Sequence, residues 1–290
     1  MADPLVRGTP AITPAACWET PLMHPVRVGT CGWSYKEWSG VFYPDDLDAG
    51  GFLSAYAERY PVVEVDSTFY RSPSRKTVEG WRDRTPDSFG FSLKVPQVIT
   101  HEKLLLDCRA EVSAFLSAAR VLGPKLLCCV LQFGYFNRQV LPSLDAFLER
   151  LEPFLEAWPG DVPLAVEVRN KTWVTPQLAD CLRRHNAVWV LTDQSWMPPP
   201  LKVVRQVDAV TGPFAYVRLL GDRRAVDALT STLDHVVIDR TAQLKDDAEA
   251  VRELRERVPV LVFVNNHFAG YAPATIEELR RYLPATEPGG

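Results

Sequence analysis

The chain has 290 residues, of which 47% are hydrophobic and 23% charged, with a net charge of −4 and a pI near 5.8. This composition is ordinary for a soluble globular protein. The acidic balance excludes a broad basic surface for non-specific nucleic-acid binding, although it is compatible with a local basic site. No apolar run approaches the roughly 18 residues of a membrane span, so no membrane partner is predicted.

The first 25 residues are rich in proline, alanine and threonine, and they contain no charged segment followed by an apolar run. No signal peptide is therefore predicted. We expect residues 1–25 to form a flexible N-terminal extension and residues 26–290 to form a single domain.

Eight short apolar runs then follow, each with the composition of a parallel strand that is covered on both faces. Strands are predicted at residues 26–33, 62–69, 89–95, 126–133, 163–170, 187–194, 214–221 and 258–266. Helical patterns are predicted at residues 53–60, 75–84, 111–123, 141–158, 175–186, 240–258 and 274–283. Thr175 and Pro176 have the residue types of an N-cap and a first helical position. Residues 195–212 hold three prolines and no helical period, so a long loop is predicted there.

The alternation of eight strands with helices predicts an α/β protein, a parallel eight-stranded (β/α)₈ TIM-type barrel in one domain. The rival fold is an open doubly wound sheet, which usually carries a glycine-rich phosphate-binding turn after its first strand. No G-x-G-x-x-G motif follows the first strand here, so the barrel is favoured.

The six cysteines form no C-x-x-C pair, and Cys128 and Cys129 are neighbours in one predicted strand, where their side chains point to opposite faces. A disulfide framework or a structural zinc site is therefore not predicted. This cysteine usage is typical of a reducing cytoplasm, which is the expected location.

Two carboxylates in one buried strand, Glu64 and Asp66, need an explanation, because an unpaired buried carboxylate costs several kcal/mol. Nearly every other predicted strand also ends on polar residues, and in a barrel such ends converge on one mouth, where active sites lie. These residues are Trp33, Ser34, Glu64, Asp66, Lys94, Gln132, Glu167, Arg169, Asp193, Arg218, Asn265 and Asn266.

Each of the ionisable residues taken alone is equally compatible with a structural ion pair that closes one end of the barrel. The set as a whole favours a nearly neutral cluster that binds a ligand. Such a cluster can hold an anion through arginine side chains while carboxylates remain for proton transfer.

Aromatic and histidine side chains accompany these strand ends. Trp33 and Tyr35 follow the first strand and Tyr70 follows the second, where their rings can stack on a sugar or a base, or pack against the barrel. His101 and His267 follow the third and eighth strands.

No cofactor and no metal ligand is predicted, with a divalent metal ion as the minor alternative. Carboxylates and histidines at the strand ends could bind such an ion, but no H-x-H or H-E-x-x-H spacing occurs. The interleaved lysine and arginines compete for the same carboxylates. No serine stands in a G-x-S-x-G motif, so a Ser–His–Asp triad is not favoured either.

Taken in order, several fragments resemble the YecE-like family, the domain of unknown function 72, over about residues 26–283. These fragments are GTCGWSYKEWSGVFYP, VVEVDSTFYRSP, FGFSLKVPQVITH, LLCCVLQF, VEVRNKTW, TDQ, FAYVRLLG and FVNNHFAGYAPATIEEL. The resemblance implies a TIM-type barrel and a candidate pocket, but no established reaction. Similar proteins carry R-L-H-G in the seventh strand, whereas residues 218–221 here read R-L-L-G. If that histidine takes part in chemistry, His101 or His267 replaces it here or the activity is altered.

Three functions fit these residues, and the sequence does not specify the oligomeric state. The first is an enzyme of hydrolase or lyase type that acts on a small or extended phosphorylated or sugar-containing substrate by general acid–base chemistry, without a redox cofactor. In it, Glu64 and Glu167 transfer protons and Asp193 orients a neighbouring group. Lys94, Arg169 and Arg218 hold the anion, while residues such as Tyr70, His101 and Asn265 line the pocket. The second is a nucleic-acid-processing barrel that stacks a base on Trp33, Tyr35 and Tyr70. The third is a non-catalytic protein that binds an anionic metabolite.

Overall fold

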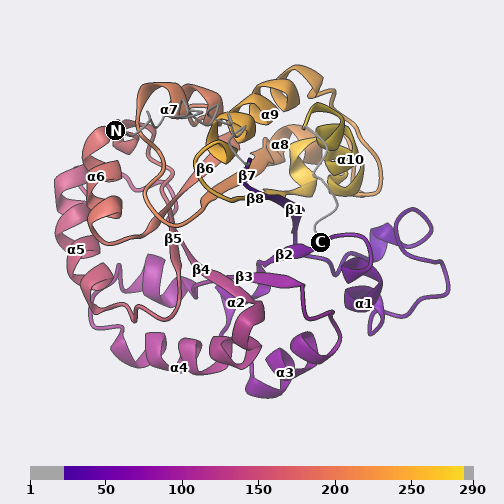
Figure 1. Ribbon diagram of the computed structural model, residues 1–290, viewed down its shortest axis with the longest axis horizontal. Helices are drawn as coiled ribbons and strands as arrows, with labels where there is room; N and C mark the ends of the chain where they lie inside the picture. The colour runs from indigo at the N-terminus through magenta and orange to yellow at the C-terminus, as the bar shows by residue number, and fades with distance from the viewer. Residues whose placement is uncertain (1–22, 284–290) are drawn as a thin grey trace, which may run out of the picture.

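Eight parallel strands close into a barrel in chain order, β1 to β8, in a computed structural model that describes residues 23–283 (Figure 1). This confirms the predicted TIM-type fold. The strands are β1 Val26–Cys31, β2 Val62–Val65, β3 Gly90–Lys94, β4 Leu126–Gln132, β5 Leu164–Glu167, β6 Val188–Gln194, β7 Ala215–Gly221 and β8 Val260–Val264.

Helices surround the barrel, as Figure 1 shows. They are α1 Phe52–Ala57, α2 Ser67–Tyr70, α3 Arg75–Asp83, α4 Arg109–Ala119, α5 Leu144–Ala157, α6 Pro176–Arg184, α7 Pro200–Gln206, α8 Arg223–Asp227, α9 Thr241–Arg255 and α10 Ala272–Tyr282. Five short helical turns complete the connections: η1 Lys36–Trp38, η2 Val98–Glu102, η3 Arg120–Lys125, η4 Lys171–Trp173 and η5 Asn266–Phe268.

The structure corrects the sequence predictions at residues 195–212 and at strand ends, among them the end of the fifth strand, which lies at Glu167 instead of residue 170. Residues 195–212 contain the helix α7 where a long loop was predicted. Pro199 is its N-cap and Pro200 its first residue, a place where a missing N–H costs nothing, and Val203 is buried. The second strand ends at Val65 instead of residue 69, and the following residues form α2.

Two apolar layers hold the barrel together. Side chains inside it, such as Cys128 and Phe263, form one buried cluster, and side chains between the barrel and its helices, such as Cys129, form the other. Cys128 and Cys129 therefore point to opposite faces, as predicted. The cysteines within the described range are free thiols: Cys31, Cys108, Cys128, Cys129 and Cys181.

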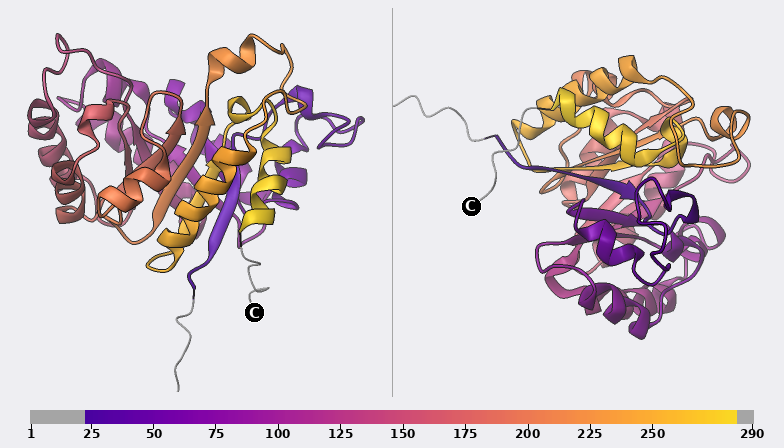
Figure 2. Two further views of the ribbon diagram at one scale, coloured as in Figure 1. Left: turned by 90° about the horizontal axis from the view of Figure 1, so that it is seen from above. Right: turned by 90° about the vertical axis from the view of Figure 1, so that its right-hand side faces the viewer.

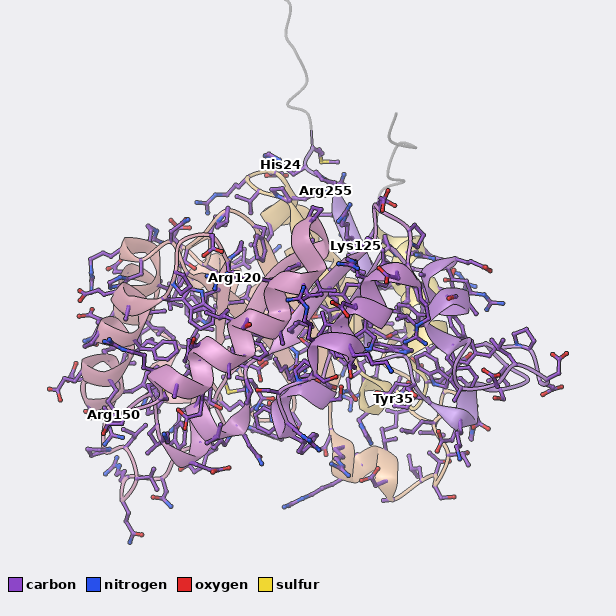
Figure 3. The ribbon with its side chains drawn as sticks, turned by 90° about the horizontal axis from the view of Figure 1, so that it is seen from below. His24, Tyr35, Arg120, Lys125, Arg150 and Arg255 are labelled. Atoms are coloured by element: carbon purple, nitrogen blue, oxygen red, sulfur yellow. The ribbon has the colours of Figure 1, made fainter. Side chains whose placement is uncertain are left out.

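The two ends of the barrel are distinct. At the amino end, the backbone N–H of His24 donates to the Arg255 carbonyl at 3.0 Å, and Arg255 Nε donates to the His24 carbonyl at 3.1 Å. Tyr35, which follows β1, lies at the opposite end (Figure 3). Figure 2 shows that β1 begins and α10 ends on the same side of the barrel, the amino side. Most of the predicted N-terminal extension, residues 1–22, falls outside the described residues.

Within residues 23–283, no helix combines the length and apolarity that crossing a membrane requires.

Thr175 caps α6 as predicted, and its hydroxyl accepts a hydrogen bond from the backbone N–H of Leu178 at 3.4 Å, with Pro176 at the first helical position. We expect Thr175→Ala to lower the free energy of unfolding by about 1 kcal/mol, the usual value of an N-cap. Urea denaturation measures it, with Thr172→Ala at an exposed neighbouring position as the control. Equal effects of the two changes would contradict the capping role.

Candidate active site at the barrel mouth

The inward-facing residues at the carboxyl ends of the strands form the floor of the barrel mouth. Glu64 of β2 is in register with Cys31 of β1, and Glu167 of β5 is in register with Gln132 of β4. Partners in register on neighbouring parallel strands point to the same side of a sheet. Strand closure thus brings Glu64, Glu167 and Arg218 of β7 together, although up to 154 residues separate them in sequence.

Arg218 lies between the two glutamates. Its Nη2 is 2.6 Å from Glu64 Oε1 and its Nη1 is 2.5 Å from Glu167 Oε2. The Tyr216 hydroxyl donates to Glu64 Oε2 at 2.7 Å, and Arg169 Nε donates to Glu167 Oε1 at 2.7 Å. All four carboxylate oxygens therefore already accept a hydrogen bond from the protein.

This ion cluster is sealed from solvent. The side chains of Glu64 and Glu167 are 0% exposed and that of Arg218 is 1% exposed. Burial acts to raise the pKa of Glu167, but the guanidinium groups of Arg218 and Arg169 outweigh it and lower this pKa to about 2. Burial likewise acts to lower the pKa of Arg218, and the two glutamates hold it well above its ordinary value. Glu167 and Arg218 are therefore charged at neutral pH.

A cavity of about 970 Å³ opens above this floor. Lys94 Nζ lies 2.6 Å from Asp66 Oδ1 and donates to Gln132 Oε1 at 3.2 Å. The Asp66 side chain is 32% exposed, in contrast to the two sealed glutamates. Asp66 is therefore the carboxylate of this cluster that a ligand can reach.

The cavity lining is cationic and rich in amides. It contains two acidic residues, Asp66 and Asp222, four amide side chains, Gln97, Gln132, Gln194 and Asn265, and five cationic residues, Lys94, Arg169, Arg218, Arg223 and Arg224. Three buried polar atoms of lining residues, Asp66 Oδ1, Gln194 Oε1 and Arg218 Nε, have no hydrogen-bond partner within residues 23–283. Asp66 Oδ1 is ion-paired with Lys94, which leaves Arg218 Nε and Gln194 Oε1 without a partner of either kind. A buried donor and a buried acceptor without partners indicate a site built for a polar ligand or ordered water.

Two histidines also line the cavity. His101 Nδ1 is 2.8 Å from Thr100 Oγ1. His267 Nδ1 is 2.9 Å from Asn265 Oδ1, and its Nε2 is 3.2 Å from Asp227 Oδ1. Leu220, at the position where similar proteins carry histidine, lines the same cavity. His101 and His267, the two histidines that could replace the missing one, therefore lie in the barrel mouth together with Leu220.

Two of the three predicted aromatic residues line the cavity. The Tyr35 hydroxyl donates to the Cys31 carbonyl at 2.6 Å, which fixes its ring, and Tyr70 is 74% exposed at the rim. Trp33 is not a lining residue, because it packs edge-to-face on Trp81 of α3 with ring centroids 5.7 Å apart.

Asp193 and Asn266 are not part of the mouth either, which corrects the sequence prediction. Asp193 is in register with Leu219, whose side chain packs in the layer between barrel and helices, so it points outward. There it meets Asp247 of α9, and burial, followed by the neighbouring Asp193, raises the pKa of Asp247 well above its ordinary value. Asn266 is 1% exposed and its Oδ1 accepts from the Ala272 N–H at 2.9 Å, at the start of α10.

One group in the described range has the composition of a metal site. Cys31, Glu64 and Asp66 each place one ligand atom within 4.8 Å of the others. Arg218 Nη2 is 3.7 Å from Cys31 Sγ and 2.6 Å from Glu64, and Lys94 is 2.6 Å from Asp66. These protein cations already neutralise the group, so a metal ion would have to displace them.

Sequence reasoning missed several residues of the site. Tyr216 stands two residues before Arg218 in β7 and therefore shares its face, a spacing that the two-residue period could have revealed. Gln97 lies two residues beyond the predicted third strand, where no local signal distinguished it. Gln194 is the last residue of the predicted sixth strand, and this strand-end position could have revealed it.

Comparison with known proteins places the chain among relatives over nearly its whole length. The model of a family described as "Protein of unknown function DUF72" matches residues 27–289. The crystal structure of a DUF72 family protein from Thermotoga maritima MSB8 is 28% identical with a TM-score of 0.71, covering 89% of this chain and 98% of that chain.

Two curated relatives match a shorter segment. UPF0759 protein YecE of Escherichia coli (strain K12) is 31% identical over 146 residues, which are 50% of this chain and 48% of YecE. UPF0759 protein YunF of Bacillus subtilis (strain 168) is 28% identical over 154 residues, which are 52% of this chain and 53% of YunF. The chain thus spans about half the length of the curated relatives that it matches.

Proposed function

The chain belongs to the DUF72 family, and from this premise we propose that its barrel mouth is the active site of an enzyme of hydrolase or lyase type. The substrate is a small phosphorylated or sugar-containing molecule, and the chemistry is general acid–base catalysis. The observation that carries this proposal is the cavity of about 970 Å³ with its cationic, amide-rich lining and its two partnerless polar atoms.

The cations of the cavity account for the anionic part of the substrate. Lys94 and Arg169 reach the cavity beside the buried cluster, and Arg218 contributes its unpaired Nε while its two Nη atoms hold the glutamates. Hydrogen bonds from charged donors to phosphate or carboxylate oxygens are about twice as strong as neutral ones.

The amide side chains of the cavity can bind a part of the substrate that carries hydroxyl groups. Each Gln or Asn side chain offers both donors and an acceptor, so the four lining amides can satisfy hydroxyl groups in either direction. The rings of Tyr35 and Tyr70 add faces on which a sugar can stack. Phosphosugars combine both parts in one molecule.

We assign proton transfer to side chains that the substrate can contact. Glu64 and Glu167 were expected to transfer protons, but their sealed oxygens are all engaged by donors. We assign them to holding Arg218 in place. The Asp66–Lys94 pair and the lining histidines are the accessible acid–base groups of the mouth.

Titration calorimetry with inorganic phosphate, glucose 6-phosphate and glucose tests this proposal. Arg169→Met should weaken glucose 6-phosphate binding about tenfold or more, since a hydrogen bond to a charged group is worth about 1.5–3 kcal/mol. Arg281→Met, at an exposed position on α10, is the matched control. Equal affinities of the two variants, or no binding of the three probes, would refute the site.

Two further assays separate the alternative functions. A panel of p-nitrophenyl phosphates and glycosides detects turnover: Asp66→Asn should retain glucose 6-phosphate binding and lose turnover. Binding with no turnover by the native chain would instead support a non-catalytic metabolite-binding protein. Retention on single-stranded DNA at low salt would support the nucleic-acid alternative, which loses one of its three stacking residues because Trp33 packs on Trp81.

A further inference from the structure

The segment that follows β3 has an unusual backbone. Residues Val98–Glu102 form a single turn of π-helix, in which the Lys103 N–H donates to the Val98 carbonyl at 2.9 Å. Leu104, Leu105 and Asp107 then adopt positive φ angles of 48°, 69° and 47°. Left-handed backbone costs an L-residue roughly 1–2 kcal/mol, and π-turns occur frequently at functional sites. Such an outlier persists only where its surroundings hold it, and it points to a function.

The Lys103 side chain bridges the residues with positive φ angles and the helix α4. Its Nζ donates to the Asp107 carbonyl at 2.8 Å and to Glu111 Oε1 of α4 at 2.6 Å. The Leu105 N–H donates to the Ile99 carbonyl at 2.9 Å, and the Leu105 side chain is buried in the core. One lysine therefore connects the strained residues to the first turn of α4.

The turn presents His101 to the cavity. The ring meets Phe69 edge-on, with centroids 5.2 Å apart, and its Nδ1 is hydrogen-bonded to the buried Thr100 hydroxyl. Gly134 faces Nε2, and a β-carbon at that position would come within 3.1 Å of it. Nε2 has no hydrogen-bond partner within residues 23–283. The imidazole is thus fixed on one nitrogen, with the other left for a ligand.

We propose that His101 is the proton-accepting catalytic residue of the mouth and that Lys103 is a positioning residue that holds it there through the strained turn. This inference rests on the proposed function and deepens it. In the step, Nε2 forms an N–H bond with a proton taken from a substrate hydroxyl or a water. The electron pair of the broken O–H bond stays on that oxygen, and the imidazolium later returns the proton to the leaving group or product.

The charges around His101 suit a base. Burial and the facing guanidinium of Arg169 lower its pKa, and Glu102, on its own turn, opposes this to a smaller extent. The ring is therefore neutral near pH 7. In the tautomer with a protonated Nδ1, Thr100 Oγ1 accepts from Nδ1–H and Nε2 carries the lone pair that a base needs.

Nuclear magnetic resonance of the imidazole nitrogens tests the inference on the full chain. His101 is assigned by comparison with His101→Gln. In the native protein, we expect His101 at pH 7 to have a protonated Nδ1 and a bare Nε2, and to titrate below the ordinary value of about 6.5. Lys103→Met should move its titration upward toward that value and weaken its contacts with Phe69, and Lys103→Arg should restore both. Lys76→Met, exposed on α3, is the control.

A protonated Nε2 at pH 7 would overturn the role of His101 as a base. A titration of His101 that is the same in Lys103→Met as in Lys76→Met would overturn the positioning role of Lys103. Adding inorganic phosphate distinguishes a failure of the proposed function from a failure of the positioning role of Lys103. If the Lys103 effects are present but phosphate leaves the His101 signals unmoved, the proposed ligand is refuted and the positioning role stands.

Discussion

Arg218→Met is expected to lower the free energy of unfolding by about 3–5 kcal/mol, because it leaves Glu64 and Glu167 buried without their shared cation. Both carboxylates are 0% exposed, and each loses a hydrogen bond of 2.5–2.6 Å. Denaturation by guanidinium chloride, followed by circular dichroism, measures the loss. Arg223→Met, at a side chain that is 78% exposed on the rim, should change stability by less than about 0.5 kcal/mol.

The double replacement of Glu64 and Glu167 by glutamine should rescue part of this loss. Glutamine keeps the shape of each side chain and removes the charge that Arg218 no longer neutralises. If Arg218→Met lowers the free energy of unfolding no more than Arg223→Met does, ion pairing does not hold the cluster. The same conclusion follows if the two glutamines restore none of the lost stability.

The stability lost in Arg218→Met should be larger at neutral pH than at acidic pH. In the native protein, the pKa of Glu167 is lowered from 4.5 to about 2. The resulting stabilisation is present above about pH 4.5 and is lost as the pH falls toward 2. The variant lacks most of it, so the stability difference between the two proteins should narrow over that interval.

Asp247→Asn is expected to raise the free energy of unfolding at pH 7 by more than about 1 kcal/mol, because asparagine stays neutral without the proton that buried Asp247 must retain, and one pKa unit corresponds to about 1.4 kcal/mol. Asp247 is 2% exposed, its Oδ2 has no hydrogen-bond partner within the described part of the chain, and Asp193 lies beside it. Because its folded pKa is raised, the folded state retains a proton that the unfolded chain releases. Stability is therefore lost as the pH rises above the unfolded value of about 3.9.

The gain from Asp247→Asn should consequently be near zero at pH 4 and largest at neutral pH, as measured by urea denaturation at both values. Asp246→Asn, at the exposed neighbour on α9, is the control and should stay within about 0.5 kcal/mol at either pH. A gain that is the same at pH 4 and pH 7 would show that Asp247 is ionised in the folded protein.

The two carboxylate sites illustrate two solutions to the same physical problem. At the floor of the mouth, a lysine and two arginines pair with three acids, and for Glu167 the neighbouring guanidinium groups outweigh burial, so its pKa is lowered. On the outer face of β6, Asp193 and Asp247 face each other, and burial favours the protonated form. The first arrangement can orient a charged ligand, whereas the second lowers stability at neutral pH because burial favours its protonated form.

The sequence by itself determined the barrel and much of its mouth. Apolar runs spaced by amphipathic segments identify strands and helices because burial on both faces leaves a local pattern. The position of Glu64, Glu167 and Arg218 at strand ends was enough to predict their meeting, since parallel strands in a closed barrel present their carboxyl ends together. Residues 199–200 show the limit of this reasoning, because two prolines that suggested a loop instead begin α7.

Only the tertiary structure decided which of these polar side chains a ligand can reach. The two-residue period of a strand predicts to which side of the sheet each side chain points. An early strand end or a shift in register changes that side. Asp193 was assigned to the mouth and points to α9, while Glu64 and Glu167 face inward but lie sealed beneath Arg218. Exposure, pairing and the strained turn behind His101 depend on contacts between residues far apart in the chain, for which a single sequence holds no local signal.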